Sequence, residues 1–190
     1  MEFVAYLLVK RMERKSRGIA VTTAIVALIG VSLLLILAAL NRRDQTVGLN
    51  QEIQYDDFAF SVLGVRKADA LGSGSSQSTA LGVYYVVTVK IANHAKRVDY
   101  KFKRDSAILV DDKGREFFLS ASGQAALDSS ASRQCNSPMP AGASCVTEVV
   151  FDVPKETGVS QMRFSEGGLV GDILDVVFYG KKRIDLGSLQ

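Results

Sequence analysis

Residues 83–91 read Val-Tyr-Tyr-Val-Val-Thr-Val-Lys-Ile, a run of β-branched and aromatic side chains. Such side chains favour β-strands, in which successive residues point to opposite faces of the sheet. One face of this strand, at the odd-numbered positions, would be wholly apolar, whereas the other face turns polar at Thr88 and Lys90. The pattern therefore predicts a strand with one face in a hydrophobic core.

Further strand signals lie on both sides of this run, and each is a short stretch of apolar, β-branched or aromatic residues: Phe58 to Val65, Ala107 to Val110, Arg115 to Leu119, Cys145 to Val153, Gln161 to Phe164 and Ile173 to Tyr179. Residues 111–114, Asp-Asp-Lys-Gly, have the composition of a hairpin turn. Seven or more short strands joined by turns predict a mainly β fold, an antiparallel β-sandwich. The polar stretches 68–79 and 120–144 are expected to be long loops, either functional or tolerated as insertions.

Residues 19–40 carry no charge over 22 positions. At about 1.5 Å per residue, a helix of that length reaches roughly 33 Å and could cross a hydrocarbon core of about 30 Å. A cleaved signal peptide, the alternative, usually has a shorter apolar region of about 7–15 residues and ends in a small-residue site. Leu37 to Leu40 fit such a site poorly, so we expect an uncleaved transmembrane helix.

The charges around this helix predict its orientation. Residues 1–18 hold five Lys/Arg and two acidic residues, a net charge of +3, and residues 41–190 hold 18 of each sign. Because basic residues stay in the cytoplasm, residues 1–18 should lie inside and residues 41–190 outside a cell membrane crossed once. Residues 41–51 would be a linker and residues 52–190 the extracytoplasmic domain. A domain without net charge does not indicate a protein that binds nucleic acid.

Two points about the N-terminal part stay open. The apolar residues after Met1 could form an interfacial helix on the inner leaflet, or the chain could begin at Met12. Small residues stand four apart on the predicted helix at Ala20 and Ala24, and again at Thr23 and Ala27. This spacing either allows close packing against another membrane helix or is simply tolerated in contact with lipid.

Both cysteines, Cys135 and Cys145, belong to the part expected outside the cell. An even number of cysteines in an exported domain favours a disulfide. Two thiols without neighbouring histidine or cysteine make a poor zinc site, so the residues predict no metal centre. A disulfide between them would close a small loop that contains Pro138, Pro140 and Gly142.

Several turn and strand signatures occur together in one order along the chain. The predicted central strand ends at Asn93, the Asp-x-x-Gly turn at Asp111 is followed by aromatic residues, and Pro140-Ala141-Gly142 leads into a strand that ends Phe151-Asp152-Val153-Pro154. Over about Ile53 to Ile184 this order resembles the telokin-like, immunoprotective-antigen type of bacterial extracellular immunoglobulin-like domain. The resemblance implies an immunoglobulin-like sandwich of unknown function, anchored or secreted. Many such proteins are lipoproteins, but this chain has no cysteine before Cys135.

A search for catalytic chemistry finds no motif. The sole histidine, His94, follows a strand in a turn-like context, and no Gly-x-Ser-x-Gly sequence accompanies it. Asp111 and Asp112 lack the alternating oxygen ligands of a calcium loop, and no phosphate loop or dinucleotide fingerprint is present. We therefore predict a non-enzymatic protein without catalytic, metal or cofactor-binding residues.

A basic stretch with interleaved aromatic residues is the one candidate partner surface, made of Lys96, Arg97, Lys101, Lys103 and Arg104. It could bind an anionic polymer or anionic lipid headgroups. The ordinary interpretation is the solvated edge of a strand, where lysine also discourages pairing with other chains.

Taken together, these features predict a single-pass membrane protein whose extracytoplasmic immunoglobulin-like domain binds an envelope protein or polymer. One alternative is a structural subunit of a membrane complex that associates through its transmembrane helix. The other is an envelope hydrolase whose site has no recognisable motif.

Overall fold

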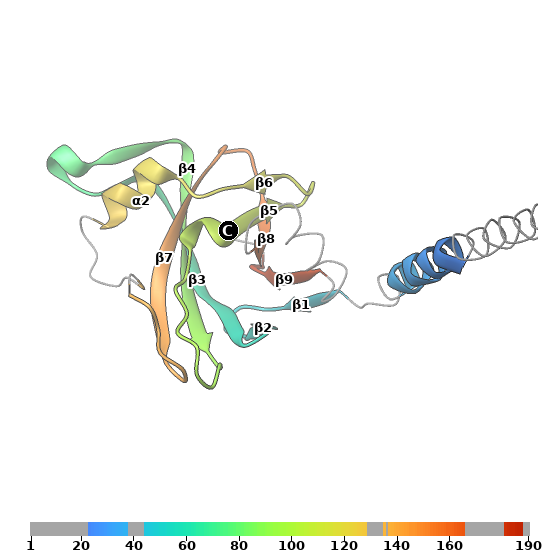
Figure 1. The fold of residues 1–190 in the computed structure, drawn as a ribbon. Helices are drawn as coiled ribbons and strands as arrows, with labels where there is room; N and C mark the ends of the chain where they lie inside the picture. The colour runs from blue at the N-terminus through green and yellow to red at the C-terminus, as the bar shows by residue number, and fades with distance from the viewer. Residues whose placement is uncertain (1–22, 38–43, 129–134, 136, 166–180, 188–190) are drawn as a thin grey trace, which may run out of the picture. The chain divides into compact units, whose positions relative to one another are not determined.

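The computed structural model describes residues 23–37, 44–128, 135, 137–165 and 181–187. The chain divides into two compact units, Met1–Arg42 and Arg43–Gln190. The second unit holds the strands (Figure 1). Their bounds are β1 Gln45–Val47, β2 Ile53–Tyr55, β3 Phe58–Leu71, β4 Ser78–Asn93, β5 Ala107–Asp111, β6 Glu116–Phe117, β7 Ser144–Val153, β8 Val159–Phe164 and β9 Lys182–Asp185. The α-helix α2 spans Ala121–Asp128.

The strands form two sheets. A four-stranded sheet has the order β2-β3-β4-β7, and a five-stranded sheet has the order β1-β9-β8-β5-β6. Strand β4 is central to the four-stranded sheet, and it pairs antiparallel with β3 and with β7, from Val83↔Val153 to Ala92↔Ser144. The predicted strand over residues 83–91 is therefore confirmed, and it runs longer than expected in both directions.

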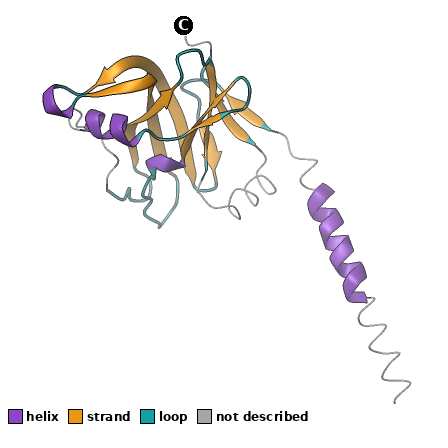
Figure 2. Ribbon diagram, turned by 90° about the horizontal axis from the view of Figure 1, so that it is seen from above, coloured by secondary structure: helices purple, strands orange, loops and turns teal. Residues whose placement is uncertain are grey.

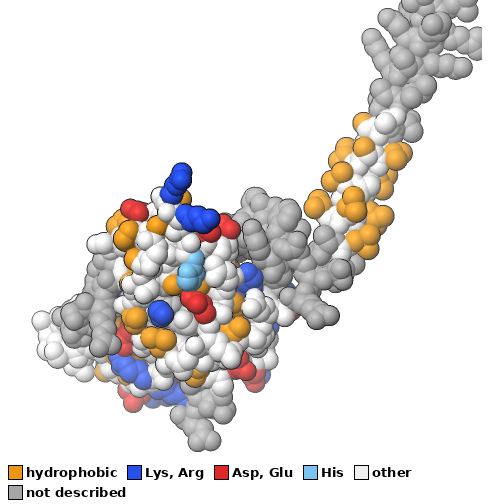
Figure 3. Space-filling model, turned by 90° about the horizontal axis from the view of Figure 1, so that it is seen from below, with side chains coloured by type: hydrophobic (Ala, Val, Ile, Leu, Met, Phe, Trp, Pro, Cys, Tyr) orange, Lys and Arg blue, Asp and Glu red, His pale blue; other side chains and the backbone are white. Residues whose placement is uncertain are grey.

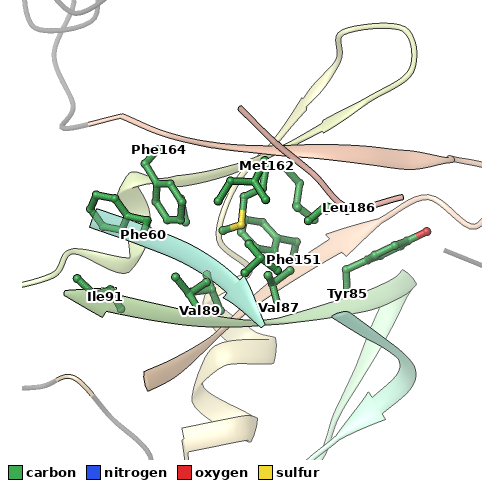
Figure 4. Packing of buried hydrophobic residues seen from close by; sticks show 14 of the residues in the cluster. Phe60, Tyr85, Val87, Val89, Ile91, Phe151, Met162, Phe164 and Leu186 are labelled. Carbon is green, nitrogen blue, oxygen red and sulfur yellow. The ribbon is translucent and has the colours of Figure 1, made fainter. Parts of the chain in front are cut away.

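The main hydrophobic core lies between the two sheets (Figure 4). Alternate residues of β4, including Val87 and Val89, are fully buried there, as the period of two requires. Opposite them, the five-stranded sheet contributes Met162 and Phe164, and Phe60 of β3 stacks on Phe164 with ring centroids 4.3 Å apart. The predicted β-sandwich is confirmed by this arrangement.

One pair departs from the antiparallel prediction. Strand β1 pairs with β9 in parallel, with Thr46 opposite Arg183. Residues 45–47 fall inside the stretch predicted to be a linker, residues 41–51. They join the sheet because the edge of β9 offers them backbone partners and Val47 packs against the core. Such long-range pairing leaves no local signal in a short polar sequence.

The outer face of the four-stranded sheet carries a second, smaller core. Figure 2 shows the helix α2 beside the strands that it covers. Tyr84 and Val86 of β4 meet Ala126 and Leu127 of α2 there. The helix approaches closely at Gly123, where an added Cβ would lie 2.7 Å from a methyl group of Val150. Only glycine fits at this contact.

The amide of Gln124 binds the free edge of β7 in the manner of a neighbouring strand. Its Oε1 accepts the N–H of Val150 at 3.0 Å, and its Nε2 donates to the carbonyl of Glu148 at 3.2 Å. The N–H of Ser120 donates to the carbonyl of Val150 at 2.8 Å. Part of the β7 edge is thereby closed by groups from α2 and the residue before it.

Both predicted long loops contain regular structure. Over residues 68–79, β3 and β4 remain paired as far as Ala70↔Thr79 and Leu71↔Ser78. A single 3-10 turn, Gly74–Ser76, lies within the short connection that remains. This ladder persists because Leu71 is buried against the α2 cluster, a contact that the local composition does not reveal. In residues 120–144 the unexpected element is α2 itself.

Two predicted elements lie wholly or partly outside the described residues. The expected strand at residues 173–179 is one, and the ends of the expected anchor, residues 19–22 and 38–40, are the other. Residues 23–37 form a helix whose side chains are all exposed. Across the residues that the structure describes, no helix reaches the combined length and apolarity needed to cross a membrane.

Candidate functional site

The connection between β4 and β5 is held in place by a buried asparagine at the end of β4. Asn93, 1% exposed, donates from Nδ2 to the carbonyls of Val98 at 2.8 Å and Met139 at 3.0 Å. Its Oδ1 accepts the N–H of Ala95 at 3.0 Å. Because buried amides are stabilising only when they are bonded, these contacts fix the two loops together.

Backbone and aromatic contacts add to this support. Tyr100 and Met139 exchange two backbone hydrogen bonds, of 2.9 and 2.7 Å. The ring of Tyr100 stacks on Phe58 with centroids 3.9 Å apart. Residues 94–103 are therefore a braced connection. The expectation that they form a strand edge is wrong, since apart from the single bridge at Tyr100 they pair with no strand in the described part of the chain.

Four of the five predicted surface cations project from this connection: Lys96, Arg97, Lys101 and Lys103 are all exposed. None of the four forms a salt bridge with a residue that the structure describes. Figure 3 shows this end of the domain, with basic side chains standing out from the surface around the histidine. We call residues 96–103, which carry these four cations, the basic loop.

Arg104 does not belong to this surface. Its Nη1 lies 2.6 Å from Oδ2 of Asp128, and its side chain is 18% exposed. Asp128 also accepts a hydrogen bond from Nε2 of Gln124 at 2.9 Å. Arg104 is therefore a structural residue that holds the end of α2, because its charge is already balanced.

The predicted disulfide is confirmed: Cys135 and Cys145 are bonded, with their Cα atoms 5.8 Å apart. Cys145 lies at the start of β7, and Cys135 is buried against the main core. The bond thus links the chain that follows α2 to the sheet beside the basic loop.

The one histidine has a simple surface contact. Nε2 of His94 lies 3.3 Å from Oε1 of Glu52, and both side chains are about half exposed. No acid and nucleophile converge on this ring among the described residues, and no group of three His, Cys, Asp or Glu residues in that part of the chain could hold a metal ion.

Asp111 has a structural role in the hairpin between β5 and β6. Burial by itself would raise the pKa of this carboxyl group. Hydrogen bonds from the Arg115 side chain and from the backbone N–H groups of Arg115 and Lys113, with the Arg115 charge, lower the pKa below its usual value. The carboxylate therefore stays ionised while it organises the turn.

A cavity of about 490 Å³ opens on the five-stranded sheet. Its lining combines basic residues from β8 and the β9 region with turn residues of the β5–β6 hairpin: Arg163, Lys181, Lys182 and Arg183 with Asp111, Asp112, Gly114 and Glu116, among others. This cluster was not predicted from the sequence. The run Lys181-Lys182-Arg183 is visible in the sequence, but its meeting with Arg163 depends on strand register.

Comparison with solved structures supports the fold. The chain is similar to MPT63, a secreted protein from Mycobacterium tuberculosis, with 14% identity and a TM-score of 0.51 over 66% of this chain and 92% of that one. It is also similar to the yjhA protein of Bacillus subtilis, with 9% identity and a TM-score of 0.52 over 74% of this chain and 99% of that one. At such identities the likeness shows the β-sandwich fold alone.

Sequence comparison gives the family. No curated protein sequence matches the chain. A family model described as a domain of unknown function matches residues 47–172, about two thirds of the chain. That match agrees with the expected resemblance to an immunoglobulin-like domain of unknown function, and it indicates no catalytic class. The chain belongs to the DUF4352 family.

Proposed function

We propose that the protein is a membrane-anchored binding module and that its sandwich domain binds an anionic polymer of the cell envelope through the basic loop. Residues 19–40 would anchor the chain, with residues 1–18 in the cytoplasm and the domain outside. The support for this orientation is the concentration of the whole net charge of +3 in the first 18 residues. The disulfide is consistent with an oxidising compartment.

The basic loop is the observation that carries the binding proposal. Its four cations lie within eight positions and have no acidic partner among the described residues, and the loop is braced by Asn93. A braced loop loses little conformational entropy when it binds. Neighbouring positive charges that are solvated and unpaired attract extended anions.

A polymer fits this surface better than a folded protein does. Protein interfaces have an apolar or aromatic centre, whereas the basic loop exposes only one large apolar side chain, Val98, at 59%. Repeated negative charges along a polymer would match repeated cations along the loop without requiring such a centre.

The test uses the full-length chain in detergent and polyphosphate as the polymer probe. We expect saturable binding that weakens as salt is added, because exposed charges are screened. The double change Lys96→Gln/Arg97→Gln should weaken binding at least several-fold. The matched control is Lys113→Gln/Lys155→Gln, which removes the same charge from two other exposed lysines. Equal losses in both variants would refute the basic loop as the site, since only net charge would then matter.

A further inference from the structure

Strands β8 and β9 each carry an arginine next to their paired residues, and both arginines line one cavity. The antiparallel register pairs Gln161 with Asp185 and Met162 with Ile184. Arg163 and Arg183 are the next residues on the two strands beyond these pairs. Like charges that lie near each other on neighbouring strands destabilise the sheet. Negative charge nearby is therefore needed to offset the repulsion between the two arginines.

Carboxylates among the described residues balance the positive charges of these two arginines only in part. Arg163 donates through Nε and Nη2 to the same carboxylate oxygen of Glu116, at 3.1 and 2.9 Å. Arg183 donates through Nη1 to Oε1 of Gln161 at 3.0 Å, and that amide carries no charge. The Glu116 carboxylate thus balances the charge of Arg163 alone, and Arg183 forms no salt bridge with a described residue.

Both arginines line the cavity of about 490 Å³. Pockets of this size commonly hold small molecules. The described lining holds four basic residues, Arg163, Lys181, Lys182 and Arg183, and three acidic ones, Asp111, Asp112 and Glu116. Asp111 is already bound to Arg115. Val110 and Phe164 add apolar lining.

We propose that this cavity binds a small molecule that carries a carboxylate or phosphate group beside an apolar body. The oxyanion would lie between Arg163 and Arg183, with Lys181 adding positive charge. Guanidinium groups suit this role, because their forked donors match two oxygens of a carboxylate or phosphate. The apolar body would contact Val110 and Phe164. The site belongs to the five-stranded sheet and is independent of the basic loop.

The test is calorimetric titration of the full-length chain in detergent with phenyl phosphate, which carries both parts of the proposed ligand. We expect one saturable site that binds phenyl phosphate more tightly than inorganic phosphate. Arg183→Gln should weaken binding at least ten-fold. Glu116→Gln should tighten it several-fold, because that carboxylate competes for Arg163. Lys155→Gln, the matched control, removes a charge elsewhere and should leave binding unchanged.

The proposal is overturned if phenyl phosphate shows no saturable binding, or if Arg183→Gln binds as the parent does. Should Arg183→Gln fail to fold, Arg183→Lys is the variant to test. Lysine keeps the positive charge but lacks the paired N–H donors of a guanidinium group, so weaker binding is still expected. Lys96→Gln/Arg97→Gln should bind phenyl phosphate normally, which separates this site from the basic loop. Vesicles containing phosphatidic acid identify the source: binding that Arg183→Gln abolishes indicates a lipid headgroup, and binding of phenyl phosphate alone indicates a soluble ligand.

Discussion

Replacing Thr147 with valine should stabilise the domain. Thr147 lies in the middle of β7, opposite Val89 of β4, and it is 0% exposed. Among the described residues, its hydroxyl is the buried side-chain polar atom without a hydrogen-bond partner. Its neighbours on the same face of β7, Val149 and Phe151, belong to the main core. The hydroxyl therefore loses water on folding and gains nothing in return.

The magnitude follows from the cost of that hydroxyl. Leaving a buried donor or acceptor unsatisfied costs about 1–3 kcal/mol. Valine has nearly the same shape and replaces the hydroxyl with a methyl group. We therefore expect Thr147→Val to raise the free energy of unfolding by about 1–2 kcal/mol. For a domain of this size each kcal/mol shifts Tm by roughly 2–4 °C.

Thermal unfolding of the full-length chain in detergent, followed by the near-ultraviolet circular dichroism of its tyrosines, measures this shift. The matched control is Thr88→Val on β4. Thr88 is half-buried on the opposite face of the same sheet, opposite Glu148, and its replacement should change stability by no more than about 0.5 kcal/mol. An unchanged or lower Tm for Thr147→Val would refute the reasoning, because it would mean that the hydroxyl is bonded in solution.

Four further outcomes are expected. Gly123→Ala should lower stability by about 1–3 kcal/mol through overpacking, whereas Gly158→Ala, which has open space around its Cβ position, should have little effect in the same unfolding assay. Replacing Cys135 and Cys145 with serine should cost at most about 3 kcal/mol, and protein purified from the envelope should show no free thiol after denaturation. Because the pKa of Asp111 is lowered in the folded state, its contribution is complete above the usual carboxyl pKa of about 3.9 and is lost as pH falls through the folded value. Asp111→Asn should therefore be less stable at pH 7, and its urea unfolding should vary less with pH in acid. Finally, alkaline phosphatase fused to the C-terminus should be active if the domain is exported, and an inactive but stable fusion would contradict the proposed topology.

The strands were predictable where a local pattern of alternating apolar residues specified them. Residues 87–91 alternate between apolar and polar side chains, and the structure buries Val87, Val89 and Ile91 in the core. The Asp-x-x-Gly turn at Asp111 was predictable for a similar reason, because turn chemistry is local. In both cases the information lies within about ten residues of the element that it specifies.

Other elements depend on distant partners and could not be predicted. Strand β1 exists because β9, more than 130 residues later, offers it an edge. Helix α2 buries two apolar side chains, Ala126 and Leu127, in a cluster whose other described members come from β3, β4 and β7. The same limit applies to the sites: Arg104 looked like part of a basic surface until α2 placed Asp128 beside it.

The position of Gln124 has a consequence for association between copies of this chain. An uncovered edge strand can recruit a strand from another molecule, which leads to domain swapping or aggregation. In this domain the side-chain amide of Gln124 and the backbone N–H of Ser120 take the place of an incoming strand at Glu148 and Val150 of β7. The short helix thus protects the edge of β7 from pairing with strands of other molecules. Removal of α2 would leave this edge of β7 open to pairing with a strand of another molecule, even if the rest of the sandwich stayed folded.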